Sequence, residues 1–130
     1  LDANMIAAAG DDLNLGDAGF LFIENVGNLV CTAGFDLGEH LRLVALSTAE
    51  GDDKLVKYPA IFRRSNALVI TKVDLAPHCN FDMQRAADDM RRMAPEAEIF
   101  EVAALHGQGM AGMAKWLLAQ HGRFAANSVQ

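Results

Sequence analysis

The sequence has few cysteines, no excess of basic residues and no long apolar run, and each shortage argues against a class of protein. Its two cysteines, Cys31 and Cys79, are too few for a disulfide scaffold and fit a reducing compartment. Eleven basic and seventeen acidic side chains give a net charge of −6, which argues against binding to nucleic acid or to an anionic membrane. No apolar stretch approaches the roughly 20 residues that span a bilayer. The N-terminus has no basic region followed by an apolar one, so we predict a cytoplasmic location.

The length and the apolar content predict one domain at most. With 130 residues, 52% of them apolar, the chain can bury a core of its own. The first residue is Leu1 and not Met, which suggests a piece of a longer protein. We expect residues 125–130 to form a disordered tail.

The apolar residues are grouped as in an α/β protein. Continuous rather than alternating apolar runs are typical of parallel strands that are buried on both faces. Four such runs occur, at Gly19–Ile23, Leu43–Leu46, Ala67–Ile70 and Ile99–Val102. The remaining segments predict flanking helices at Leu1–Ala9, after Tyr58-Pro59, at Asn80–Ala94 with Asn80 or Asp82 as cap and Pro95 at its end, and at Met110–Gln120 with Gly122 as a stop.

One apolar run stops abruptly at a carboxylate. Phe20 to Ile23 leads into Glu24, and Gly27 and Cys31 follow within seven positions. A carboxylate there would lie at the carboxyl end of a buried strand, the edge of a parallel sheet where ligands bind. Beside a glycine that permits close backbone approach, it suits a phosphate-bound Mg²⁺. Taken alone, a strand that ends in a solvated Glu explains the run equally well.

A second motif follows the third apolar run. The run Ala67–Ile70 passes directly into the sequence TKVD, residues 71–74. TKVD resembles the NKxD motif with which GTPases recognise guanine. In that motif the Asp carboxylate accepts hydrogen bonds from guanine N1 and the exocyclic amine, and the Lys stem packs over the base. Four residues match by chance in many loops, so the weight of this motif comes from its position at a strand end downstream of Glu24.

Five stretches together resemble the HypB family of metal-chaperone GTPases, which incorporate nickel into hydrogenases. They are FIENVGNLVC at 22–31, FDLGEH at 35–40, EGDDKLVKYP at 50–59, TKVDL at 71–75 and HGQGM at 106–110. The related urease and cobalamin chaperone GTPases also have the strand-end Glu but lack the Cys-bearing sequence and the KYP segment. The resemblance implies the C-terminal part of such a protein. Residues 1–124 would then form a partial GTPase domain, an incomplete P-loop GTPase-like three-layer α/β fold with a mostly parallel sheet.

The resemblance also implies roles for residues of both motifs. Glu24 is similar to the acidic residue of the third GTPase motif, which holds Mg²⁺ directly or through water. Gly27 and Asn28 are similar to the switch turn whose backbone senses the γ-phosphate. Lys72 and Asp74 are similar to the residues that recognise guanine.

Two positions depart from the family's pattern. Thr71 replaces the commoner Asn, and because its hydroxyl can still bond to neighbouring loops, we expect weaker support of the loop and not lost specificity. Ala103 and Ala104 take the place of Ser-Ala, whose backbone N–H contacts the guanine O6. The missing Ser hydroxyl weakens the bracing of that loop, while the backbone donor remains.

Cys31 resembles the family's metal-binding cysteine, which joins a Cys-His pair to hold zinc or nickel near the dimer interface. One thiolate suits these metals but cannot fill a four-coordinate sphere, and the Cys-His pair would fall just before Leu1. Without the resemblance, a small buried apolar side chain is the better interpretation of Cys31. His78 and Cys79 are a weaker alternative pair, since adjacent positions on a turn point apart. We expect the other histidines to be ordinary surface or turn residues, namely His40, His106 and His121.

The phosphate-binding motif of GTPases is missing. Nothing in the chain matches GxxxxGK[ST], the turn whose N–H groups and Lys cradle the phosphates. We therefore predict that these 130 residues alone do not hydrolyse GTP. In the folds that this chain resembles, the P-loop strand lies inside the sheet beside the Glu-bearing strand, so its loss leaves backbone donors and acceptors unpaired.

Two functions are compatible with the sequence. The first is the C-terminal portion of a GTP-binding, GTP-hydrolysing nickel metallochaperone of hydrogenase maturation, active only in the complete protein. The resemblance then implies GTP or GDP, Mg²⁺, nickel or zinc, a homodimer, and as partners a maturation protein and the hydrogenase large subunit precursor. The second is a non-catalytic truncated relative that binds a protein partner or a metal. An upstream reading frame with a GKT turn, and with Cys-His before Leu1, would favour the first.

Overall fold

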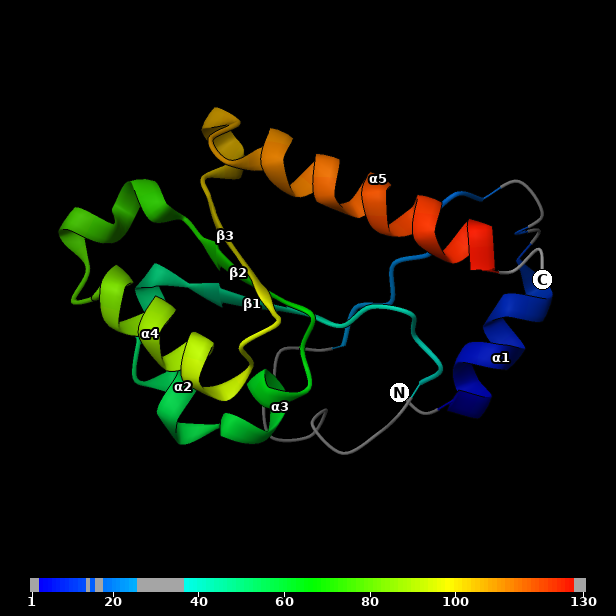
Figure 1. Cartoon of the computed structure of the whole chain (residues 1–130), viewed down its shortest axis with the longest axis horizontal. Helices are drawn as coiled ribbons and strands as arrows, with labels where there is room; N and C mark the ends of the chain where they lie inside the picture. The colour runs from blue at the N-terminus through cyan, green and yellow to red at the C-terminus, as the bar shows by residue number, and fades with distance from the viewer. Residues whose placement is uncertain (1–2, 14, 16–17, 26–36, 128–130) are drawn as a thin grey trace.

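The structure is a computed structural model that describes residues 3–13, 15, 18–25 and 37–127. Figure 1 shows the elements in chain order. They are α1 (Ala3–Asp12), β1 (Leu43–Ser47), η1 (Thr48–Glu50), α2 (Lys54–Lys57), α3 (Pro59–Arg63), β2 (Ala67–Thr71), η2 (Val73–His78), α4 (Met83–Met93), β3 (Glu98–Val102), η3 (Ala104–His106) and α5 (Met110–Asn127), where η marks a 3₁₀ turn.

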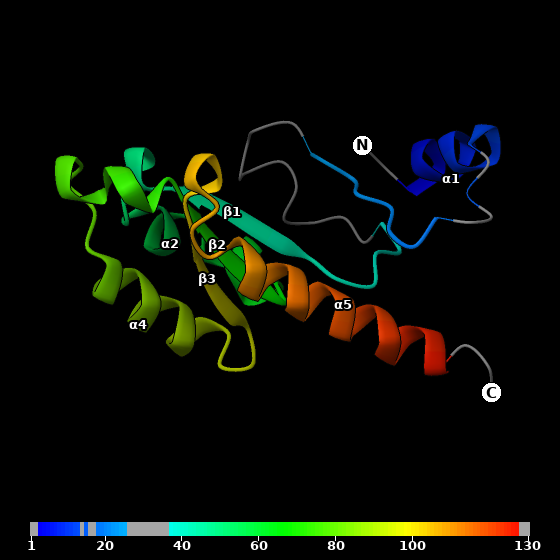
Figure 2. The same ribbon diagram turned by 90° about the horizontal axis from the view of Figure 1, so that it is seen from above.

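The three strands form a parallel sheet in the order β1-β2-β3, as the continuous apolar runs predict. The strands end in register, because Ser47 of β1 pairs with Thr71 of β2 and Thr71 pairs with Val102 of β3. The turns that follow the strands therefore leave the sheet at the same end, and they lie side by side in Figures 1 and 2. This end is called the carboxyl edge below.

One face of the sheet carries the main core. Leu46, Leu68 and Ile70 of the strands are completely buried there against Leu55 of α2 and Phe62 of α3. Met90 of α4 packs into the same cluster. Burying a side chain of this size contributes about 1.5–3 kcal/mol each, so this face supplies most of the stability of the sheet.

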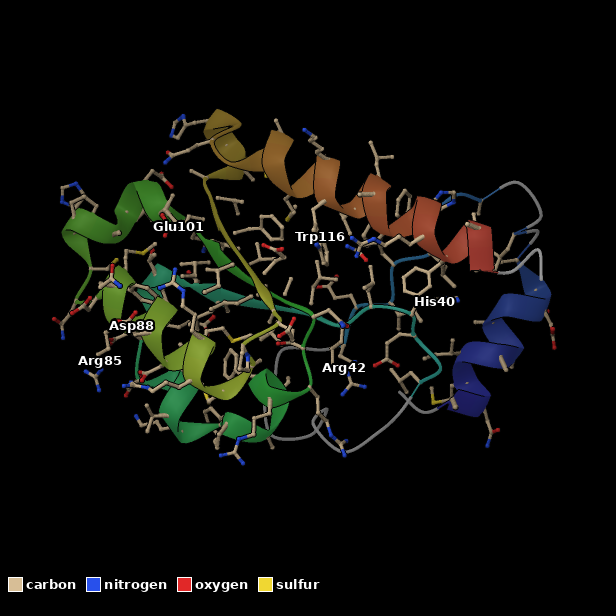
Figure 3. All side chains as sticks on the ribbon, viewed as in Figure 1. His40, Arg42, Arg85, Asp88, Glu101 and Trp116 are labelled. Atoms are coloured by element: carbon tan, nitrogen blue, oxygen red, sulfur yellow. The ribbon has the colours of Figure 1, made fainter. Side chains whose placement is uncertain are left out.

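The other face of the sheet is covered by the first half of α5. Trp116 of this helix points toward the sheet in Figure 3, and its ring lies 5.4 Å from that of Phe100 on β3. The second half of α5 extends past the sheet in both ribbon views. The arrangement is the predicted three-layer α/β fold, with α2, α3 and α4 on one side and α5 on the other.

Local sequence features explain the bounds of two helices. The side chain of Asp82 caps α4 by accepting a hydrogen bond from the N–H of Arg85 at 2.9 Å, as predicted for one of the two candidate caps. Ala94, next to Pro95, ends this helix. Pro59 begins α3, where its fixed φ and missing N–H cost nothing.

Two predicted helix ends are wrong. The opening helix, predicted at Leu1–Ala9, is α1 and continues to Asp12. The last helix does not stop at Gly122 but runs to Asn127, so residues 125–127 of the expected tail are helical. An isolated Gly inside a helix costs only about 1 kcal/mol. The helix α5 therefore continues through Gly122. Residues 128–130 lie outside the described part of the chain.

The predicted strand at Gly19–Ile23 is also wrong, since these residues are not part of the sheet. Phe20, Leu21 and Phe22 are exposed by 41%, 51% and 73% of their surfaces. Phe20 lies against Phe22 and against His121 of α5, with ring centroids 6.0 and 5.2 Å apart. A strand forms only where a neighbouring strand satisfies its backbone groups, and among the described residues no strand pairs with this run.

Among the described helices, none combines the length and the apolar character needed to cross a membrane.

The turn from β3 into α5 depends on Gly109. Its φ is +72°, and a Cβ at this position would lie 2.0 Å from the carbonyl oxygen of Glu101, a residue of β3 that is labelled in Figure 3.

We predict that Gly109→Ala lowers the free energy of unfolding by about 2 kcal/mol or more, because the strain of a left-handed Ala and its clash with the backbone both destabilise the folded state. Gly122→Ala is the matched control, since nothing lies within 4 Å of its added Cβ and its helix is regular. It should raise stability by about 0.5–1 kcal/mol. Urea titrations of both variants measure this, and equal effects would contradict the structure.

Candidate functional site at the carboxyl edge

The candidate site consists of three turns at the carboxyl edge of the sheet. They are η1 after β1, the TKVD turn that leads from β2 into η2, and the turn 103–109 between β3 and α5. In open α/β sheets this edge is where ligands bind. The three turns adjoin because the strands before them are paired in register.

Lys72 turns the chain sharply at the end of β2. It has φ 58° and ψ 40°, and it is the one non-glycine residue with positive φ in the described ranges. A left-handed non-glycine residue costs about 1–2 kcal/mol, so neighbouring contacts must hold it. Its carbonyl accepts two hydrogen bonds, from the Thr48 hydroxyl at 2.8 Å and from the N–H of Leu75 at 2.9 Å. These bonds fix the backbone that carries Asp74.

Thr48 was not identified from the sequence as a site residue. It is only 1% exposed and directly follows β1, whose last residue pairs with Thr71. Its hydroxyl is therefore placed to reach the TKVD turn across the strand pair. A polar residue directly after a buried apolar run is the signal that would have pointed to it.

The turn 103–109 is closed by its own backbone. The N–H of Ala103 donates to the carbonyl of Gln108 at 3.0 Å, and the N–H of Gln108 donates back at 3.2 Å. The N–H of His106 donates to the Ala103 carbonyl at 3.0 Å. Since the N–H of Ala103 is engaged, the backbone donor that suits a ligand is that of Ala104, the first residue of η3, which has no acceptor within the turn.

Asp74 meets His106 across the two turns. Asp74 Oδ2 lies 3.7 Å from His106 Nε2, with 31% of the Asp74 side chain and 60% of the His106 side chain exposed. The prediction that His106 is an ordinary turn residue is therefore incomplete, because the fold places it against the carboxylate of the TKVD motif. His106 was missed because the two residues are 32 positions apart in the sequence.

An ion pair connects the segment 50–59, which follows β1, to α4. Asp52 is 9% exposed and lies 3.6 Å from the guanidinium of Arg85. Beside it, the hydrogen bond from Lys57 lowers the pKa of Asp53, and the same bond raises the pKa of Lys57. These pairs orient the start of α2.

The structure does not bring Glu24 to the carboxyl edge. Glu24 is exposed on the irregular stretch 18–25, which lies away from the three turns in Figures 1 and 2. The predicted position of Glu24 at the end of a buried strand is therefore wrong. Because Mg²⁺ is held by carboxylates together with phosphate oxygens, the Mg²⁺ role of Glu24 stays a prediction. Gly27, Asn28 and Cys31 lie outside the described residues.

The alternative pair consists of His78, the last residue of η2, and Cys79 directly after it. Within the described part of the chain, no three His, Cys, Asp or Glu side chains gather closely enough to hold a metal ion. Cys79 is partly buried against the main core, as a small apolar side chain would be.

The bond from Thr48 to Lys72 gives a test of how the TKVD turn is held. We predict that Thr48→Val lowers the free energy of unfolding by about 1 kcal/mol, because the part-buried hydrogen bond to the Lys72 carbonyl is lost while the side-chain volume is kept. Thr48→Ser keeps the hydroxyl and should restore most of this loss. Hydrogen exchange at the Leu75 amide should rise in Thr48→Val and not in Thr48→Ser. Unchanged exchange in Thr48→Val would mean that the turn does not depend on this bond.

Comparison with known proteins identifies relatives of the chain. No family model matches it. The hydrogenase maturation factor HypB of Escherichia coli strain K12 is 48% identical over 120 residues, which cover 92% of this chain and 41% of that protein. HypB of Azotobacter vinelandii is 43% identical over 122 residues, covering 94% and 40%. The hydrogenase/urease maturation factor HypB of Helicobacter pylori is 39% identical over 122 residues, covering 91% and 50%.

Solved structures of HypB proteins are also similar to this chain. The crystal structure of HypB from Archaeoglobus fulgidus matches with a TM-score of 0.87 at 39% identity, over 93% of this chain and 59% of that one. HypB from Helicobacter pylori in complex with nickel matches with a TM-score of 0.86 at 38% identity, over 95% and 59%. The chain spans about two fifths to one half of the length of these curated relatives. The predicted resemblance to the HypB family is therefore confirmed, for a chain that corresponds to part of the length of its members.

Proposed function

We propose that this chain is the guanine-recognising part of a GTP-binding nickel chaperone of hydrogenase maturation. The observation that carries the proposal is the meeting of Asp74 and the Ala103-Ala104 turn at the carboxyl edge, in a chain that is similar to HypB over nine tenths of its length. The fold of solved HypB structures supports it. GTP hydrolysis belongs to the complete protein, in which a P-loop joins this part.

The chemistry of the edge matches the Watson–Crick face of guanine. An ionised carboxylate accepts hydrogen bonds only, and guanine offers two donors side by side, N1–H and the exocyclic amine. The Asp74 carboxylate would accept both, and the N–H of Ala104 would donate to O6. Adenine presents an acceptor at N1 and would leave Asp74 facing a lone pair. The stem of Lys72 would pack over the base.

Phosphate binding and hydrolysis need groups that this sequence does not contain. A P-loop supplies the N–H groups and the Lys that hold the β- and γ-phosphates, and no such motif occurs in the chain. We therefore propose that the chain alone is inactive as a GTPase. Glu24, Gly27 and Asn28 keep their proposed roles toward Mg²⁺ and the γ-phosphate only in the complete protein.

Nickel is the proposed cargo. A relative from Helicobacter pylori has been crystallised with nickel, which supports a metal role for this family. Cys31 is the proposed ligand of nickel or zinc in this chain. A Cys-His pair from the rest of the protein would complete the coordination sphere of the metal. The proposed partners are a hydrogenase maturation protein, the hydrogenase large subunit precursor and a second copy of the chaperone, in the cytoplasm.

The proposed recognition of guanine is tested by a substitution that should change which base the site prefers. In a protein in which this chain is joined to a P-loop half, Asp74→Asn removes a charge-assisted acceptor and sets an amide donor against two donors of guanine. We expect GTP affinity to fall by about 30- to 1,000-fold, equivalent to about 2–4 kcal/mol. Xanthosine triphosphate should gain relative to GTP, because the Asn amide can donate to its C2 carbonyl. Nucleotide competition measures both affinities.

Asp88→Asn is the matched control for this experiment. Asp88 is exposed on α4 and pairs with Arg91 at 3.2 Å, so its change should alter neither affinity. An Asp74→Asn protein that still prefers GTP over xanthosine triphosphate would reject guanine recognition by this motif. The alternative of a non-catalytic module that binds a protein partner or a metal would then be favoured.

The metal assignment is tested by comparing the two cysteines. If Cys31 is a ligand only together with a Cys-His pair, the chain alone should bind Ni²⁺ or Zn²⁺ weakly, because a single thiolate leaves a four-coordinate sphere incomplete. Cys31→Ala should then reduce this binding far more than Cys79→Ala, which removes a side chain packed against the core. Isothermal titration with each metal measures the difference. The reverse ranking would move the site to His78 and Cys79.

A further inference from the structure

We propose that His106 is a positioning residue for guanine recognition, an imidazole brace that holds the Asp74 carboxylate in the orientation that the base requires. This inference rests on the proposed guanine site and adds to it a residue that the TKVD motif does not contain. Its basis is the contact between His106 Nε2 and Asp74 Oδ2, 3.7 Å apart.

The contact joins two fixed backbones. Asp74 follows Lys72, whose carbonyl is held by Thr48 and by the N–H of Leu75. His106 is the last residue of η3 and donates its N–H to Ala103 at 3.0 Å, and Gly107 follows it in the left-handed conformation. Although the His106 side chain is 60% exposed, its Cα therefore has a defined place beside the carboxylate.

The chemistry allows His106 and guanine to share Asp74. A carboxylate has about four lone-pair positions, and the two donors of guanine use one on each oxygen. His106 Nε2 can donate to the second lone pair of Oδ2 without displacing the base. A brace of this kind limits rotation of the Asp74 side chain in the empty site, so less conformational freedom is lost when the base binds.

The chain has a reason to need such a brace. The turn 103–109 contains no Ser or Thr, and its only polar side chains are His106 and Gln108. The observed distance of 3.7 Å is longer than a hydrogen bond, so the two groups are neighbours that are not yet bonded. Polar contacts in ligand-free sites often shorten when the ligand arrives, and a small change of the imidazole torsion would close this one.

The test uses this chain joined to a P-loop half, with GDP as the probe in equilibrium titrations. His106→Ala should weaken GDP binding about fivefold, as expected for the loss of one exposed polar contact to a carboxylate. His106→Gln, whose amide nitrogen reaches about as far as Nε2, should bind GDP within about twofold of the unsubstituted protein. His78→Ala, which changes an exposed histidine of η2, is the control and should have no effect.

A double-mutant cycle separates positioning from a general structural role. In the Asp74→Asn background, His106→Ala should cause no further loss of GDP affinity, because the carboxylate that it braces is absent. The free energy of unfolding should not change with His106→Ala, since the side chain is exposed. Restored affinity in His106→Gln and the coupling to Asp74 together support the brace.

Three results would overturn the inference. They are an unchanged GDP affinity in His106→Ala, a tighter affinity that shows competition with the base, and a loss that persists in the Asp74→Asn background. In these cases the unsubstituted protein still prefers guanine through Asp74, so the proposed function stands and only the brace is rejected. A joined protein without any guanine preference would reject both.

Discussion

Parallel pairing of β1, β2 and β3 in register is the constraint on which the candidate site depends. The ends of the strands are aligned, with Ser47 opposite Thr71 and Thr71 opposite Val102, so the residues that follow them are brought to one edge. Packing in the core maintains this alignment, because Leu46, Leu68 and Ile70 must face the same core. A slip of one residue in β2 would turn these side chains to the other face, and Thr48 would no longer reach the Lys72 carbonyl.

The site is ordered by its backbone, while the side chains proposed to touch the base stay accessible. Lys72 adopts a left-handed conformation that Thr48 stabilises, and the turn 103–109 closes on itself through Ala103 and Gln108. Gly109 makes that turn possible, because any side chain there would meet the carbonyl of Glu101. A backbone that is ordered before binding loses little entropy when a ligand arrives, which favours specific recognition.

The sequence predicted those elements whose causes are local. The three apolar runs that became β1, β2 and β3, the Asp82 cap of α4 and the Pro59 start of α3 were all predicted, and TKVD was correctly placed at a strand end. The run Gly19–Ile23 failed because a strand also needs a neighbour, which is not a property of the run itself. Thr48 and His106 were missed for the same kind of reason, since each lies against a residue that is far away in the sequence.

The proposed recognition of guanine at this edge would give selectivity but little affinity. Hydrogen bonds to a charged group contribute roughly 1.5–3 kcal/mol each, and a backbone donor such as the Ala104 N–H adds about 1 kcal/mol. Association costs an estimated 4–15 kcal/mol in lost translational and rotational freedom, so the contacts to the base do little more than offset it. The surplus that holds a nucleotide must come from charge-assisted contacts to its phosphates, which a P-loop supplies. Because Asp74 and the 103–109 turn lie on one continuous sheet edge beside β1, a P-loop half would supply the affinity, and this chain would select the base.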